Sequence, residues 1–404
     1  MTGNQEKNSR GIPWSPRLVG VVCALVTGSA IIIAQGVGRA DESGKPKGIP
    51  LGNFRVHPEI QVTTRWEDNI YKTATNPQSD EIVLIKPQVK MNKQGKKSKL
   101  SLAAALEAEY YNNYSLEDNY GYQFKLEYGL EPNRRLKLNA GYDYLVEHED
   151  RGSPGTLAAP ASLGPNQWLQ QVWKVSTNYT KNRLQAGLNL GHGERTSGNN
   201  NQSLQNHSWN EVGASAKWAF FPKIGLLLET GWKGIQYDIQ PVMDSREVRL
   251  QTGATWRVTK KTSGTVKIGM TTKQFDAKTT PTGSTLSWEG EVEWHPMTRT
   301  SVNVNLGRRF QEGATGAYVA TNYRVKLDHE LRPRLNVLTG ISLDTNMYDT
   351  GLLERYWKTD LGLKYQFPRW FALDAGWFRS VKESTQPTAN YESNGVLFTL
   401  TGTL

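Results

Sequence analysis

The chain has 404 residues, of which 37% are hydrophobic, and its formal net charge is +10. Soluble globular domains contain roughly 45–50% apolar residues, so the chain has too few of them for a buried core of ordinary thickness. The aromatic residues are spread along the whole chain, which argues against disorder. The longest basic run is Lys96-Lys97-Ser98-Lys99, so no face gathers the positive charge that nucleic-acid binding requires. These features indicate a folded sheet whose second face also meets water.

The N-terminal residues have the order of a secretory signal peptide. Arg10 and Arg17 precede an apolar run over residues 18–37, and Gly38-Arg39-Ala40 supplies the small residues of a cleavage site. The apolar run is nearly long enough for the alternative, a membrane helix that is not removed. The polar remainder of the chain favours cleavage. We expect a cleaved signal peptide over residues 1–40.

The only cysteine, Cys23, lies inside this apolar run. The mature chain would therefore carry no thiol and no disulfide, which excludes zinc-finger and iron–sulfur sites. We expect no cofactor and no metal.

Short turns recur along the rest of the chain, and each interval between them holds two segments that alternate apolar and polar residues. In one segment Leu136, Leu138 and Ala140 alternate with Lys137 and Asn139. Successive side chains of a β-strand point to opposite faces, so each segment reads as a strand with one apolar face. The predicted strands are 54–70, 81–92, 98–112, 118–131, 134–149, 167–180, 183–195, 207–221, 223–239, 244–259, 263–276, 283–295, 299–312, 316–331, 334–347, 353–367, 369–383 and 390–403.

The position of the aromatic residues distinguishes a membrane barrel from a soluble β-sandwich. Trp218, Phe220, Trp294, Tyr365 and Phe367 each lie within about five residues of a short turn, on the apolar face, as an interfacial aromatic girdle requires. An even number of strands also lets the last strand pair with the first, which leaves no edge unsatisfied in lipid. The sequence therefore predicts an all-β fold in the bacterial outer membrane: a closed antiparallel transmembrane β-barrel of about 18 strands, with short periplasmic turns and longer extracellular loops. This outer-membrane β-barrel would span residues 54–404 and follow a periplasmic N-terminal segment (41–53). Its surroundings would be outer-membrane lipid and lipopolysaccharide.

Polar residues on the opposite strand face would point into the lumen. A barrel of this size is too wide to be filled by side chains alone, so a polar path through the wall is expected. Glu289, Glu291 and Glu293 form an acidic row on one strand, and Lys267, Lys273 and Arg309 are candidates to face it from the neighbouring strands. The acidic row either creates a transverse electric field across the lumen or is neutralised by these basic residues. The candidate pore-lining residues are Lys137, Lys174, Arg249, Arg257, Lys267, Glu289, Glu291, Glu293, Asn303, Asn305, Arg309, Arg324, Lys326 and Asp328.

Two loops bear on the width of that path. Residues 151–166 are rich in Pro, Gly and Ala with little charge, and they either fold into the lumen as a constriction or stay exposed. Residues 196–206 carry many amide and hydroxyl groups, which suit hydrogen bonding to sugars and equally suit an ordinary solvated loop.

The sequence contains no signature of catalysis. None of the six histidines has metal-ligand or hydrolase spacing. His192, with Ser197 and Asn199 or Asn200, faintly resembles the residue set of outer-membrane phospholipases, but the order and spacing of those enzymes are not reproduced. We do not expect an enzyme.

The opening strand, Phe54-Arg55-Val56-His57-Pro58-Glu59-Ile60, and the segment Glu67-Asp68-Asn69-Ile70 carry a resemblance to a known family. With the signal peptide and the 18-strand pattern, they resemble the outer-membrane β-barrel porins that accompany exopolysaccharide and capsule export systems. The resemblance implies export of a polysaccharide across the outer membrane, with periplasmic export components and the polysaccharide as partners. Two alternatives stand beside export: a general or sugar-selective diffusion porin, and a non-conducting barrel that anchors or organises surface polysaccharide.

Overall fold

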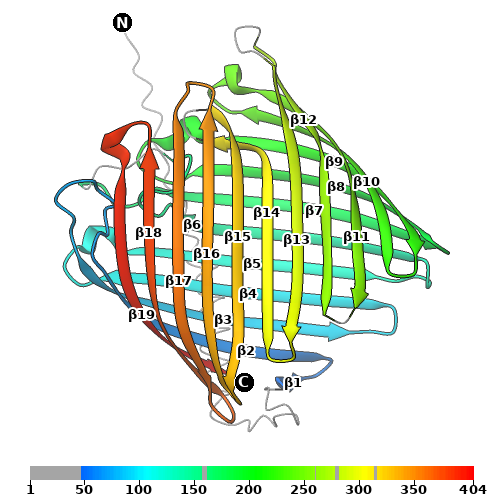
Figure 1. Cartoon of the computed structure of the whole chain (residues 1–404), viewed down its shortest axis with the longest axis horizontal. Helices are drawn as coiled ribbons and strands as arrows, with labels where there is room; N and C mark the ends of the chain where they lie inside the picture. The colour runs from blue at the N-terminus through cyan, green and yellow to red at the C-terminus, as the bar shows by residue number, and fades with distance from the viewer. Residues whose placement is uncertain (1–46, 157–161, 260, 278–281, 314–315) are drawn as a thin grey trace, which may run out of the picture.

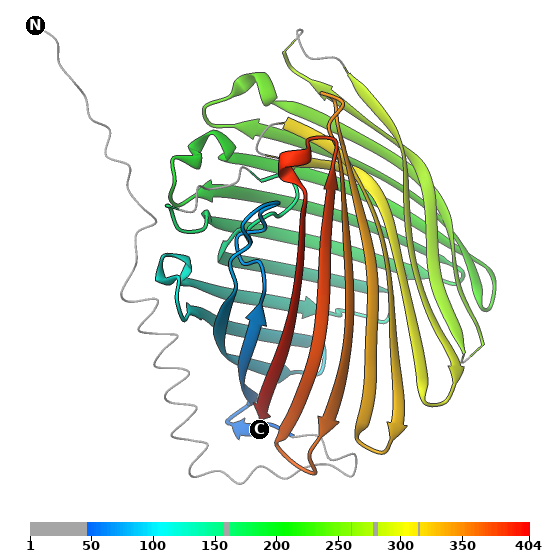
Figure 2. The same ribbon diagram turned by 60° about the vertical axis from the view of Figure 1, so that its left-hand side comes forward.

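The computed structural model describes residues 47–156, 162–259, 261–277, 282–313 and 316–404. Within these residues, 18 long strands, β2 to β19, follow one another around a single wall (Figures 1 and 2). Every strand pairs antiparallel with the next in sequence, and β19 pairs with β2, from Gly395 with Glu67 to Thr403 with Glu59. The predicted closed antiparallel barrel of 18 strands is confirmed. The cleaved signal peptide stays a prediction, because residues 1–40 lie outside the described part of the chain.

The strand bounds are β1 Ile49–Leu51, β2 Phe54–Glu67, β3 Asp80–Gln94, β4 Ser98–Tyr111, β5 Asn119–Leu130, β6 Leu136–His148, β7 Gln167–Lys181, β8 Leu184–Ser197, β9 His207–Phe221, β10 Ile224–Tyr237, β11 Ser245–Thr259, β12 Thr262–Phe275, β13 Gly283–Met297, β14 Thr300–Gly313, β15 Gly316–Arg332, β16 Leu335–Tyr348, β17 Leu353–Gln366, β18 Phe371–Ser384 and β19 Tyr391–Thr403. Single 3-10 turns lie in the loops at η1 Ser115–Glu117, η2 Gln202–Gln205, η3 Pro241–Met243 and η4 Pro387–Ala389. No helix in these described ranges has the length and apolar character needed to cross a membrane.

The largest difference from the predicted bounds is at the end of β2, which stops at Glu67 rather than at residue 70. The Asp68 and Asn69 side chains bond backbone groups there: the Asp68 carboxylate accepts from the Asn394 amide (2.7 Å), and the Asn69 amide donates to the Thr73 carbonyl (2.8 Å). Such local side-chain bonds offer the backbone an alternative to the sheet ladder. The short strand β1, which the alternation does not predict, pairs only with the start of β2 and lies in the expected N-terminal segment, 41–53.

The two faces of the wall differ as the alternation predicts. On β10, Leu226 and Leu228 are exposed by 54% and 53%, and the outward face continues across the wall through Leu250 and Ile268. The described residues form no central apolar core, only small clusters such as Val56 with Val89 and Ala104 on the outward face. A wall that exposes its apolar side chains all round is suited to lipid.

Aromatic side chains mark the end of the barrel that carries the short turns. Trp218, Phe220, Trp294, Tyr365 and Phe367 all lie beside a short turn and are 39–56% exposed. Tryptophan and tyrosine favour the membrane–water interface because one end of the side chain is apolar and the other is polar. These five side chains form the aromatic girdle that the sequence predicts.

Candidate functional site

The candidate site is the lumen, and strand pairing places all of the predicted pore-lining residues on its side of the wall. Facing residues of an antiparallel pair share a face, so Lys267 opposite Glu289, Glu291 opposite Asn305 and Asn303 opposite Lys326 form continuous inward rows. Whether these residues line a conducting path stays a prediction. The remaining members lie on the same face: Lys137, Lys174, Arg249, Glu293, Arg309, Arg324 and Asp328. Arg257 has no printed strand partner, but its amide bonds the Lys223 carbonyl, and alternation from Thr255 places it on the inward face.

Charges in the middle of this face are neutralised by close partners. The Lys267 ammonium lies 2.8 Å from the Glu229 carboxylate and 2.6 Å from that of Glu289, and Arg249 lies 3.2 Å from Glu289. Lys273, expected beside the same acidic row, is instead paired with Glu312 at 2.5 Å. At Glu289 the acidic row is therefore neutralised by its neighbours and does not create a transverse field across the lumen. Lys137 and Lys174 lie on β6 and β7 and take no part in this cluster.

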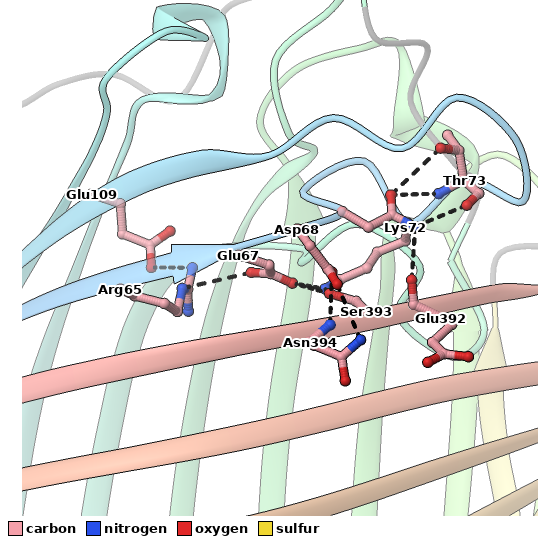
Figure 3. A network of polar contacts seen from close by, with 10 residues as sticks. Arg65, Glu67, Asp68, Lys72, Thr73, Glu109, Glu392, Ser393 and Asn394 are labelled. Atoms are coloured by element: carbon pink, nitrogen blue, oxygen red, sulfur yellow. Dashed lines mark hydrogen bonds and ion pairs between the residues drawn. The ribbon is translucent and has the colours of Figure 1, made fainter.

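A polar network at the loop end joins the first strand of the barrel to the last (Figure 3). Glu67, on β2, accepts a hydrogen bond from the Ser393 hydroxyl of β19 at 2.7 Å and forms an ion pair with Lys72. Arg65 lies between Glu67 (3.7 Å) and Glu109 (3.6 Å). Glu67 is only 5% exposed. Because buried charges are stable only when paired, this network fixes the closing seam at its loop end.

Lys72 lies in the loop between β2 and β3, where it is nearly buried. Loss of water and the nearby Arg65 guanidinium lower its pKa to about 7. Its charge therefore changes close to neutral pH, which is unusual for a lysine. The titrating ammonium lies against the carboxylate that joins β2 to β19.

The described ends of the loop between β6 and β7 turn into the mouth of the barrel. Gly152 packs against Tyr391 of β19 and against Lys72, and Gly155 packs against Tyr318 of β15. Arg151 is held by two bonds to Glu117, at 3.0 and 2.6 Å. The described residues 151–156 therefore take the inward one of the two alternatives. Residues 157–161 lie outside the described part of the chain.

The hairpin between β14 and β15 is a second element that narrows the mouth of the barrel. The end of β14, Arg309–Gly313, separates from β13 and turns inside the wall (Figure 1). It stays paired with Gly316–Ala320 of β15, which in turn stays joined to β16, and these two segments are called the hairpin end. Its Glu312 accepts hydrogen bonds from Lys273 of β12 (2.5 Å) and Tyr237 of β10 (3.0 Å). The two narrowing elements touch where Gly155 meets Tyr318. The sequence carries one sign of this displacement: Arg308 and Glu312 occupy outward positions of β14, which are apolar lower in the strand.

Beneath the inward loop, the lumen keeps a hollow of about 580 Å³ against β15 to β19. Basic Arg324 and Lys358 and acidic Asp344 and Asp360 line it together. A second hollow of about 510 Å³ lies between the hairpin end and β8 to β11, and Trp209 and Arg249 are among its lining residues. Both hollows combine opposite charges with aromatic or apolar surface, so neither selects strongly for one sign of charge.

The residues considered for catalysis do not form a site. His192 and Ser197 lie on opposite faces of β8, since an odd number of steps along the strand separates them. The Ser197 hydroxyl donates to the Gln202 carbonyl (2.8 Å), and His192 contacts Asn210 (2.9 Å). Nowhere in the described ranges do histidine, cysteine and carboxylate side chains gather in a group that would hold a metal ion.

Comparison with solved structures finds similar chains of low sequence identity. They include OpdK of Pseudomonas aeruginosa (11% identity, 86% of this chain and 99% of that chain, TM-score 0.47). OccAB3 of Acinetobacter baumannii is also similar (8% identity, 88% and 100%, TM-score 0.49), as is OprD of Pseudomonas aeruginosa (10% identity, 91% and 99%, TM-score 0.46). No curated protein matches the sequence.

The family comparison covers nearly the whole chain. The model of the family described as "Putative beta-barrel porin 2" matches residues 42–403. With a closed 18-strand barrel and an apolar outer face, this match places the protein in the bacterial outer membrane as a porin-like barrel. The chain belongs to this β-barrel porin family.

Proposed function

We propose that the protein is an outer-membrane diffusion channel for small, uncharged, polar solutes such as sugars. The observation that carries this proposal is the combination of a narrowed mouth with a lumen whose charges neutralise one another. The inward loop and the hairpin end limit solute size. The pairing of Lys267 with Glu229 and Glu289 leaves little net field to favour an anion or a cation. Hydroxyl-rich solutes can exchange hydrogen bonds with such paired groups without needing a counter-charge.

Purified barrel in liposomes tests the proposal directly. We expect swelling rates in isotonic monosaccharide well above those of empty liposomes, falling steeply for trisaccharides, and little selectivity between potassium and chloride in planar bilayers. Absence of both swelling and conductance would contradict the channel. Strong ion selectivity would contradict the uncharged substrate class and leave the channel intact.

Export of an exopolysaccharide is the second candidate, and it comes from the resemblance of the opening strand. Lumen-facing aromatic side chains favour it, because Trp168 and Trp209 are partly exposed on the inward face, where sugar rings could pack against them. It requires the inward loop and hairpin end to move aside for a polymer. A clean deletion strain separates the candidates: loss of secreted polymer supports export, whereas normal polymer with slower sugar uptake supports diffusion. A barrel that only anchors surface glycan predicts neither conductance nor a change in either flux.

A further inference from the structure

The wall of the barrel is interrupted between β13 and β14. Pairing between these strands runs from Met297 with Thr300 to Trp288 with Arg308 and then stops. Above this point residues 283–287 pair only with β12, and residues 309–313 pair only with β15. The neighbouring β14–β15 and β15–β16 ladders continue to the loop ends of their strands. Figure 1 shows the upper end of β14 turning away from β13.

The displaced hairpin end lies on the inner surface of the strands it has left. The side chains of Arg308, Phe310 and Glu312 share the face of β14 that points outward lower in the wall, because their spacing is two residues. Here that face meets inward-facing groups: Arg308 donates to the Thr285 hydroxyl (3.2 Å), and the Phe310 ring lies against Gly283. The end of the hairpin has therefore passed inside its neighbours.

The surface on which it rests is polar and incompletely bonded. Lys273 is fully buried there and is held by Glu312. Gln251 and Thr271 are also buried, and the Gln251 carbonyl oxygen and Thr271 hydroxyl have no hydrogen-bond partner within the described ranges. Leaving buried polar atoms unbonded costs free energy that exposure to water restores. These unbonded polar atoms weaken the contact between the hairpin end and the wall. The inward position of the hairpin end therefore depends on a few charged bonds, such as that between Glu312 and Lys273.

The hairpin end has a second possible position, in the wall beside β13. Continuing the β13–β14 register past Trp288 and Arg308 brings Leu286 opposite Phe310 and Thr285 opposite Gln311. The first of these pairs would face lipid and is apolar, and the second would face the lumen and is polar. The free edge of β13 would gain the backbone partners that an exposed strand edge lacks. The wall position therefore suits Phe310 and Gln311, whereas Glu312 would lie on the outward face at the loop end of the wall.

We propose that the β14–β15 hairpin end is the gate of the channel. It is a two-position element, held inward by Glu312 bonded to Lys273 and Tyr237, and opened when residues 309–313 pair with residues 283–287 of β13. Moving it to the wall clears one of the two obstructions at the mouth. The role of the hairpin end as a gate rests on the proposed channel function, but its movement can be measured whether or not the barrel conducts.

Cysteine pairs in the full-length barrel, with Cys23→Ser, report the open position. Leu286→Cys with Phe310→Cys face each other only when the hairpin end joins the wall, where paired Cβ atoms lie about 4.5–5.5 Å apart, close to the reach of a disulfide. Thr285→Cys with Gln311→Cys repeats the test on the inward face. Val292→Cys with Val304→Cys, paired in this structure, is the matched positive control. Each pair is oxidised in outer membranes, with and without Glu312→Gln.

We expect partial bridging of both test pairs and a rise of about tenfold in the bridged-to-free ratio with Glu312→Gln, because a charged hydrogen bond is lost. Bridged barrels should also show higher single-channel conductance than reduced ones. Absence of bridging in both test pairs and both backgrounds, while the control pair bridges, would overturn the gate. Bridging without a rise in conductance would overturn it too, provided the reduced barrel conducts. If no variant conducts, the proposed channel function fails, and the bridge alone decides whether the hairpin moves.

Discussion

Leu226 and Leu227 are neighbours on β10 whose side chains point to opposite faces of the wall. Leu226 is 54% exposed on the outward face, whereas Leu227 lies opposite Lys217 and Gly253 on the inward face. We expect Leu226→Arg to destabilise the inserted barrel by about 2–4 kcal/mol, because it places a guanidinium against hydrocarbon. Leu227→Arg is the matched control and should cost far less. Urea unfolding of both variants in lipid vesicles measures the difference, and equal losses would contradict the assignment of the two faces.

Lys72 gives the mouth a pH-dependent charge. Its pKa is lowered to about 7 by burial and by Arg65, so the side chain is charged at about pH 6 and mostly neutral at about pH 8.5. Raising the pH therefore removes a positive charge beside Glu67 and leaves the mouth more negative. We expect the potassium-to-chloride permeability ratio to rise across this range. Reversal potentials measure the ratio, and Lys72→Arg, which stays charged, should abolish the change. A change that persists in the arginine variant would assign the titration to another group.

At the scale of elements, the inward position of the β6–β7 loop depends on glycines with left-handed backbones. Gly155 has φ +73°, and a Cβ there would lie 2.8 Å from the Tyr318 ring. We expect Gly155→Val to push the loop off Tyr318 and raise single-channel conductance with little effect on barrel assembly. Gly351 is the matched control, because it has φ +82° and a Cβ added there would meet nothing within 4 Å. Gly351→Val carries similar backbone strain without the clash, so equal conductance in the two variants would contradict the role of the loop contact.

At the scale of the whole molecule, the sequence alone predicts the wall but not the closure of its mouth. Alternation locates both ends of each of the 18 wall strands, β2 to β19, within three residues, because an apolar outer face repeats in every one of them. The inward loop and the displaced hairpin end depend on contacts between distant residues, such as Glu312 with Tyr237 and Gly155 with Tyr318. The alternation of apolar and polar residues within one strand cannot predict such contacts. For the same reason the sequence places Lys273 beside the acidic row of β13, whereas its partner, Glu312, lies on the displaced end of β14.

A closed barrel exists only while its first and last strands stay joined, so the Glu67 network should matter to the stability of the whole molecule. Glu67→Ala leaves Arg65 and Lys72 without their shared carboxylate in a nearly buried site. Breaking a buried ion pair from one side costs about 3–5 kcal/mol, and we expect a loss toward the lower end because Arg65 keeps Glu109. Glu392→Ala is the matched control, because it breaks the exposed ion pair between Glu392 of β19 and Arg379 of β18. It should cost at most about 1 kcal/mol.

Urea unfolding in vesicles compares the two variants. A small effect of Glu67→Ala would show that backbone pairing between β19 and β2 closes the barrel without help from the network, whereas a large one would make the seam the point from which the barrel unfolds.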